Sequence, residues 1–348
     1  ILDGSPDPIP ESVQEEVDAR TELDYIHRSA PSWLGLTERL HEARDLIRTA
    51  YTVLGGDDEF FLRRGLAEAI GVLDDNPAIV ACMGQSLGFV PSSDGRHMGF
   101  GPGYPHRGIV NTDPDVRQRL LVAMSRYDAI TCYAVTRTDT WRETWGEILD
   151  WSSVYAAEMQ HAIASWLSGG LIAVDEIYWL RSGENASVRD VTGPHLTFAD
   201  WWGDPIHAAE VSRFQGLLAD HAVAVGAADP SSAPGIVSEA IEVFVHQKEL
   251  DRVARLDETA PTPRRGVADR ISDLVRGLLG RMPSSVRAPL WHSGRHLLRI
   301  LRRGRESGGV RIDSLVDEGL LPADSRAIET QRELHDVERI VGEFYRVR

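Results

Sequence analysis

The chain has 348 residues, 42% apolar and 26% charged, which is typical of a folded globular protein and excludes fibrous and wholly disordered classes. Its net charge of −16 argues against a nucleic-acid partner, because such binding depends on basic groups that neutralise phosphates. No window approaches the roughly 18 apolar residues of a membrane span, so we expect neither a transmembrane helix nor a membrane partner. The two cysteines, Cys82 and Cys132, cannot form a disulfide framework and predict a reducing, cytoplasmic location.

The basic residues are unevenly distributed in type and in place. Lys248 is the only lysine, so the remaining 36 of the 37 basic residues are arginine, a usage typical of GC-rich genomes. Residues 264–311 hold twelve arginines against three acidic residues, in a chain that is otherwise strongly acidic. This segment indicates a local anionic ligand or an acidic partner surface, or else a solvated helix face that pairs with acids elsewhere.

Apolar residues three and four positions apart predict amphipathic helices along most of the chain. The expected helical segments are 11–29, 37–54, 57–73, 113–137, 141–168, 206–226, 236–256, 266–280, 285–304 and 324–346. Residues 171–180 are a short strand or a buried helix, and periodicity alone does not decide between them. Patterns of period two are nearly absent, so the sequence predicts a mainly α fold, a single large helical domain with long irregular loops.

One stretch, residues 84–108, breaks the helical pattern and is rich in glycine and proline. Irregular loops of this length are uncommon in compact domains and are often functional. Residues 257–265 are polar and contain proline, which is typical of a connector. We therefore expect a helical body over residues 1–256, a connector over 257–265 and C-terminal helices over 266–348.

Two Glu-x-x-His pairs, Glu38–His41 and Glu158–His161, each place a carboxylate and an imidazole on one helix face. Pairs of this kind bind the irons of di-iron sites in four-helix bundles, together with one glutamate from each of two further helices. Glu68 is one candidate for those further ligands, and a second is not evident. A non-haem di-iron oxidase is therefore one hypothesis for the function.

A second candidate metal site lies in residues 286–309, where His292 and His296 are four apart among apolar residues and arginines. A histidine on an apolar helix is suited to bind haem iron, and nearby arginines can hold the haem propionates. A core histidine bonded to a backbone carbonyl would give the same pattern. His335, in a later helical segment, is a further candidate ligand.

Residues 286–309 resemble the proximal region of the tryptophan-dioxygenase-like haem-dependent oxygenases, and among them the enzymes of the pyrrolnitrin pathway. The resemblance rests on an Arg-Ala-Pro beginning at Arg287, on His296-Leu297 and on Gly308-Gly309. It implies an all-α fold, a haem b cofactor and His296 as the iron ligand, with His335 ranked second and His292 third. It also implies an aromatic amino acid or derivative as the substrate, with molecular oxygen or peroxide as co-substrate.

The glycine-rich loop supplies the remaining candidate site residues. His97 and His106 are candidate distal acid–base groups, and Arg96 and Arg107 are candidates to hold a substrate carboxylate. A mobile surface loop is the alternative interpretation. The nine tryptophans are expected to line the core and a deep aromatic pocket.

The sequence therefore predicts a haem-dependent oxygenase of specialised metabolism, located in the cytoplasm and acting on a small aromatic substrate. Two alternatives stand beside it. One is the di-iron oxidase, and the other is a non-enzymatic all-α interaction protein that docks through its arginine-rich segment. Assembly into a homo-oligomer is left open.

Overall fold

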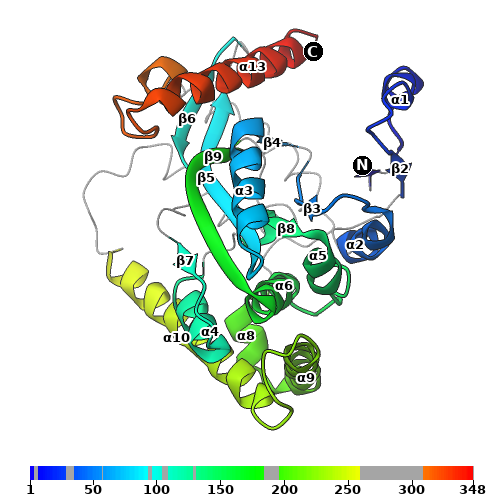
Figure 1. Ribbon diagram of the computed structural model, residues 1–348, viewed down its shortest axis with the longest axis vertical. Coiled ribbons are helices and arrows are strands. Elements are labelled where there is room, and N and C mark those ends of the chain that lie inside the picture. Colours follow the sequence, from blue (N-terminus) through cyan, green and yellow to red (C-terminus); the bar gives the residue numbers. More distant parts are fainter. Residues whose placement is uncertain are drawn as a thin grey trace, which may run out of the picture.

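A mixed β-sheet with helices packed on it forms the centre of the molecule in the computed structural model (Figure 1). The structure describes residues 1–3, 7–28, 35–56, 58–92, 96–103, 109–127, 131–183, 196–258 and 309–347. Over these residues, no helix is both long and apolar enough to span a membrane.

The sheet is built on two long parallel strands, β5 (Ile79–Pro91) and β9 (Gly170–Ser182). Five shorter strands extend it, each antiparallel to its neighbour, in the order β3-β8-β5-β9-β4 with β6 beside β5 and β7 beside β9. They are β3 (Tyr51–Thr52), β4 (Glu59–Phe61), β6 (Met98–Pro102), β7 (Val110–Asn111) and β8 (Val135–Arg137). A separate parallel pair joins β1 (Leu2–Asp3) to β2 (Ile26–His27).

The predicted mainly α fold is therefore wrong, and the composition of the central strands explains why. Nearly every residue of β5 is buried, so its sequence lacks the alternation of apolar and polar residues found in half-exposed strands. The segment predicted as a glycine-rich loop, 84–108, contains the second half of β5 and all of β6. Residues 171–180, left open between strand and helix, belong to β9.

Ten helices are described around the sheet. They are α1 (Glu11–Asp18), α2 (Gly35–Leu46), α3 (Arg63–Asp75), α4 (Val116–Ser125), α5 (Thr138–Thr144), α6 (Val154–Ser168), α8 (Phe198–Gly203), α9 (Ala208–Ala224), α10 (Ala233–Glu258) and α13 (Ser325–Val347). Three short 3₁₀ turns are η1 (Thr131–Tyr133), η2 (Pro205–His207) and η3 (Ile312–Ser314). The predicted helices 206–226, 236–256 and 324–346 correspond to α9, α10 and α13.

Helix α3 shows how the helices are seated on the sheet. It buries Ala69 and Leu73, four residues apart, as expected for the inward face of an amphipathic helix. A Cβ atom at Gly65 would lie 2.3 Å from the Cβ of Tyr178 on β9, so only glycine allows this close approach. The helix is thereby fixed against the middle of the sheet.

Of the three hydrophobic clusters among the described residues, two pack at opposite ends of the sheet. The larger cluster joins the first half of β5 and β9 to α4, α6, α8, α9 and α10, and α6 is buried on nearly all sides. The smaller cluster joins Leu87, Phe89 and Phe100 of the sheet to Leu334 and Val337 of α13. Figure 1 shows α13 at one end of the sheet and α8, α9 and α10 at the other.

Several predicted elements lie outside the described residues. These are the helices 266–280 and 285–304 and most of the connector 257–265. The proposed division into a body, a connector and C-terminal helices therefore stays a prediction.

Candidate active site

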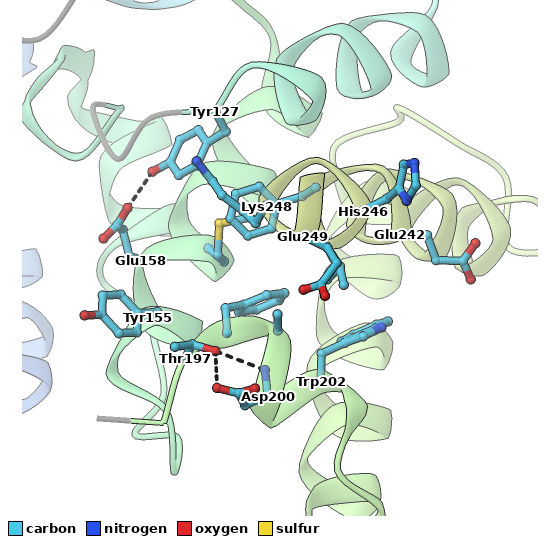
Figure 2. Close-up of a pocket in the computed structure, with 15 residues that line it drawn as sticks. Tyr127, Tyr155, Glu158, Thr197, Asp200, Trp202, Glu242, His246, Lys248 and Glu249 are labelled. Atoms are coloured by element: carbon cyan, nitrogen blue, oxygen red, sulfur yellow. Dashed lines mark hydrogen bonds between the residues drawn. The ribbon is translucent and has the colours of Figure 1, made fainter. Parts of the chain in front are cut away.

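A pocket with a volume of about 1130 Å³ opens among the helices at one end of the sheet. Its walls come from α6, α8, α10 and the residue that follows α4 by two positions, Tyr127 (Figure 2). Its lining is mainly aromatic and acidic. The aromatic members are Tyr127, Tyr155, Phe198, Trp202 and Phe244, and the acidic members are Glu158, Asp200, Glu242 and Glu249.

Helical spacing explains how the pocket residues come together. Tyr155, Glu158 and Met159 lie three and four positions apart, so α6 presents them on one face. Phe244 and Lys248, four apart on α10, share a face of that helix and also line the pocket.

The third wall is set by the start of α8. The Thr197 hydroxyl accepts a hydrogen bond from the Asp200 backbone N–H at 3.1 Å and donates to the Asp200 carboxylate at 2.6 Å. The first contact caps one backbone N–H group at the start of α8, and the second fixes the Asp200 side chain. Trp202, on the same helix, stacks on Phe198 with ring centroids 6.1 Å apart and planes 16° from parallel.

Glu158 forms a hydrogen-bonded group with Tyr127 at the wall of the pocket. Its Oε1 accepts a hydrogen bond from the Tyr127 hydroxyl at 3.1 Å, and that hydroxyl lies 3.3 Å from the Thr131 hydroxyl. Desolvation by the surrounding protein raises the pKa of Glu158, although the Tyr127 hydrogen bond and the Lys248 charge act in the opposite direction. Burial, with the Glu158 charge adding to it, raises the pKa of Tyr127 well above its ordinary value, so the phenol stays protonated.

A second glutamate, Glu59 at the start of β4, lies near Cys132, as Glu158 does. Its Oε2 accepts a hydrogen bond from the Gly56 backbone N–H at 2.9 Å, and burial raises its pKa. Burial and the charges of Glu158 and Glu59 together raise the pKa of the Cys132 thiol well above its ordinary value. Cys132 is therefore protonated and unsuited to act as a nucleophile.

The positive charge of the pocket comes from Lys248. Its ammonium lies 5.5 Å from the centroid of the Phe244 ring, within the range of a cation–π contact. Figure 2 shows this ammonium beside Tyr127, at the end of the pocket where Glu158 lies. Glu242, His246 and Glu249 of the same helix also line the pocket, and Figure 2 shows Glu242 and His246 farther from Tyr127 than Lys248 is.

The site residues predicted in the glycine-rich loop are placed elsewhere or are not described. The His97 backbone N–H donates to the Ser92 hydroxyl at 3.0 Å, and its Nδ1 lies 2.8 Å from the Arg311 guanidinium. His97 and Arg96 immediately precede β6, at the α13 end of the sheet, and do not line the pocket described above. His106 and Arg107 lie outside the described residues, so their predicted roles stay predictions.

The predicted metal ligands fall into two groups. His296 and His292 lie outside the described residues. His335 lies on α13, half exposed, with Asp313 at 3.5 Å and Glu338 at 3.7 Å. Across the described part of the chain, no group of three or more histidine, cysteine or acidic side chains is arranged to hold a metal ion.

The two Glu-x-x-His pairs do not converge as di-iron ligands. His41 Nε2 lies 2.7 Å from the Ile148 carbonyl, and His161 Nε2 lies 3.3 Å from the Thr131 carbonyl. The His161 ring also stacks on Trp145 with centroids 4.1 Å apart, and its burial lowers its pKa to about 3. Both imidazoles therefore serve packing, and Glu158 forms its hydrogen bond with Tyr127 instead of joining a metal site.

Comparisons with known proteins give few matches. No family model matches the sequence, and no curated protein matches it. Among solved structures, the chain is similar to residues 1–349 of TarS from S. aureus, at 12% identity and a TM-score of 0.37, over 73% of this chain and 81% of that one. A longer TarS structure matches at 12% identity and a TM-score of 0.36, over 71% of this chain and about half (48%) of that one.

These findings correct the predicted function. The predicted haem-dependent oxygenase is wrong, because it required an all-α fold, whereas the described residues form a mixed β-sheet. The di-iron oxidase is wrong as well, because His41 and His161 bond to backbone carbonyls and do not converge. The all-α interaction protein is wrong because the described residues contain the mixed sheet. Residues 286–308, which carried most of the resemblance, lie outside the described part, so haem binding through His296 stays a prediction.

Sequence reasoning selected Glu158, but for a different chemistry, and did not select Tyr127, Phe244 or Lys248 as site residues. One signal was available. Lys248 is the single lysine of the chain, and it lies in this pocket. The expectation that tryptophans line an aromatic pocket is confirmed for Trp202.

Proposed function

We propose that the protein is an enzyme that cleaves glycosidic bonds or transfers a glycosyl group to an acceptor, with Glu158 as its acid–base group. The observation that carries this proposal is the desolvated Glu158 carboxyl group, bonded to Tyr127, at the wall of a large aromatic pocket. A carboxyl group whose pKa is moved toward neutrality is suited to exchange protons with a substrate.

The pocket lining supports a sugar as the substrate. Sugar rings combine an apolar C–H face with a rim of hydroxyl groups, so they need flat apolar surfaces and hydrogen-bond acceptors together. Tyr155 and Trp202 supply aromatic rings, and Asp200, Glu242 and Glu249 supply carboxylate acceptors. Enzymes that act on glycosidic bonds use carboxyl groups of this kind.

The chemistry assigned to Glu158 follows from its contacts. In its charged form it removes the proton from an attacking hydroxyl group, either of water or of an acceptor sugar. The hydroxyl oxygen then forms a bond to the anomeric carbon, and the leaving group departs with the electron pair of the bond that breaks. Tyr127 donates to one carboxylate oxygen throughout and so fixes the orientation of the group.

The test uses Glu158→Gln, which keeps the shape of the side chain and removes its acid–base function. Parent and variant are compared on a panel of nitrophenyl glycosides and nucleotide-activated sugars, with free and transferred sugar measured by mass spectrometry. Turnover is expected to fall by about 10²–10⁴-fold, while quenching of tryptophan fluorescence by saccharides is retained. The exposed Glu143→Gln on α5 is the matched control, and equal turnover in all three proteins would contradict the proposal.

The predicted cytoplasmic location and the homo-oligomer left open by the sequence remain predictions. Location is tested by fractionating cells that produce the full chain. Oligomeric state is tested by light scattering of the purified protein.

A further inference from the structure

The distribution of basic residue types singles out one position in the pocket. The chain contains 37 basic residues, and the only lysine among them is Lys248. This lysine lines the pocket, one helical turn beyond Phe244, and its side chain is partly buried. At every other basic position the chain has arginine, so the lysine in the pocket is an exception.

Lys248 and Glu158 line the same end of the pocket. Figure 2 shows the Lys248 ammonium beside Tyr127, whose hydroxyl donates to Glu158 at 3.1 Å. The ammonium lies 5.5 Å from the centroid of the Phe244 ring, and its charge favours the ionised form of Glu158. The Tyr127 hydroxyl acts in the same direction as Lys248, because its hydrogen bond also favours the ionised form of Glu158. Glu59 lies beyond Cys132, whose pKa both glutamates raise.

The remaining charged groups of the pocket do not help to ionise Glu158. Asp200 on α8 and Glu242 and Glu249 on α10 are acidic, and His246 on α10 also lines the pocket. A negative charge close to a carboxyl group makes its ionised form less favourable. Among the described residues that line the pocket, Lys248 is the one whose charge opposes the desolvation of Glu158.

We propose that Lys248 is a positioning residue that keeps the Glu158 carboxyl group charged, so that it acts as a base toward the substrate. The proposal rests on the function proposed above, because it gives Lys248 a role through Glu158. An ammonium suits this role better than a guanidinium, because it is a compact point charge on a flexible stem.

The first test measures the charge of Glu158 without any substrate. Infrared difference spectra between the parent and Glu158→Gln isolate the stretch of the protonated Glu158 carboxyl group. In Lys248→Met this band is expected to persist to higher pH than in the parent, and in Lys248→Arg to lie between the two. Equal midpoints in the parent and Lys248→Met would overturn the proposal.

A second test keeps the native side chain, in case Lys248→Met does not fold. Reductive methylation with isotope-labelled formaldehyde retains the charge of lysine and labels only Lys248 and the N-terminal amine. The Lys248 signal in the NMR spectrum is expected to shift as Glu158 takes up a proton, and this step is expected to vanish in Glu158→Gln. Identical titration curves of this signal in the two proteins would overturn the coupling.

The activity arm separates this inference from the proposed function. With any glycoside that the parent turns over, the acid limb of the kcat/KM profile is expected to move to higher pH in Lys248→Met. At a fixed pH on the acid side, the activity of Lys248→Met is expected to be lower than that of the parent by about tenfold for each pH unit of the displacement. Arg213→Met, exposed on α9, is the matched control and is expected to keep the parent profile.

The outcomes are distinguishable. A displaced infrared midpoint without turnover of any sugar supports the role of Lys248 and contradicts the proposed function. Turnover that is lost in Glu158→Gln but has the same acid limb in Lys248→Met supports the function and overturns the role of Lys248.

Discussion

Two glutamates, one in the middle of strand β9 and one on helix α6, are held in opposite ways. Glu176 on β9 is 5% exposed and is bound by two arginines, Arg64 from α3 at 3.3 Å and Arg326 from α13 at 3.1 Å. Glu158 on α6 has a neutral hydroxyl as its hydrogen-bond partner and a lysine as its charged neighbour. The difference shows that a buried carboxylate with two guanidinium partners fixes a helix to the sheet, whereas one with weaker compensation is available for proton transfer.

The surroundings of each glutamate fit this contrast. Glu176 contributes to the attachment of α13, where Leu334 and Val337 pack on the sheet and the Met98 backbone N–H donates to Glu338 at 2.7 Å. Glu176 is not among the residues that line the described pocket, whereas Glu158 lines this cavity of about 1130 Å³. The surroundings of Glu176 therefore have a structural role, and those of Glu158 form the candidate site.

The largest change in stability is expected from Glu176→Gln. The substitution leaves Arg64 and Arg326 without their shared carboxylate, and both arginines are partly exposed, so water compensates in part. We expect a loss of about 2–3 kcal/mol in the free energy of unfolding. Urea denaturation followed by circular dichroism measures it, and an unchanged midpoint would show that this ion-pair network does not attach α13.

A smaller change is expected from Tyr127→Phe, which removes the hydroxyl that Glu158 and Thr131 share. We expect a loss of about 1–2 kcal/mol in stability, since a buried group loses its hydrogen-bond partner. Because this hydrogen bond lowers the pKa of Glu158, its removal is expected to raise that pKa further. The infrared titration of Glu158 measures the change, and a lowered midpoint would contradict the assigned contact.

The smallest effect is expected in the pH dependence of stability. The pKa of Glu158 is raised in the folded state, so folded protein holds the proton more tightly than unfolded protein does. Stability from this group is present below the ordinary glutamate pKa and is lost as the pH rises through the raised value. Glu158→Gln is expected to remove this decline, as measured by denaturation at a series of pH values, and a decline equal to that of the parent would contradict it.

The sequence predicted the amphipathic helices well and the sheet poorly, for one physical reason. Helices α9, α10 and α13 each keep a polar face, so the spacing of their apolar residues is visible. Strands β5 and β9 are covered on both faces and have no such alternation. The short strands β3, β4 and β8 lie next to helices in the sequence. The helical segments predicted over 37–54, 57–73 and 113–137 therefore extend too far and include these strands.

The candidate site was predicted only in fragments, because its residues come from distant parts of the chain. Glu158 was selected for its spacing from His161, yet the fold turns His161 toward the Thr131 carbonyl and Trp145. The scarcity of lysine is typical of a GC-rich genome, and the structure adds that the single lysine, Lys248, lies in the pocket. The fold brings residues of α6, α8 and α10 together there, and no local pattern of the sequence shows this.

The most direct test is a paired measurement on Glu158→Gln and Glu176→Gln, in which sugar turnover and free energy of unfolding are determined for both variants under the same conditions. The account predicts that Glu158→Gln loses turnover by about 10²–10⁴-fold and keeps its stability near neutral pH, whereas Glu176→Gln loses stability and, where folded, keeps its turnover. Turnover that survives in Glu158→Gln, or is lost in folded Glu176→Gln, would contradict the assignment of the two glutamates.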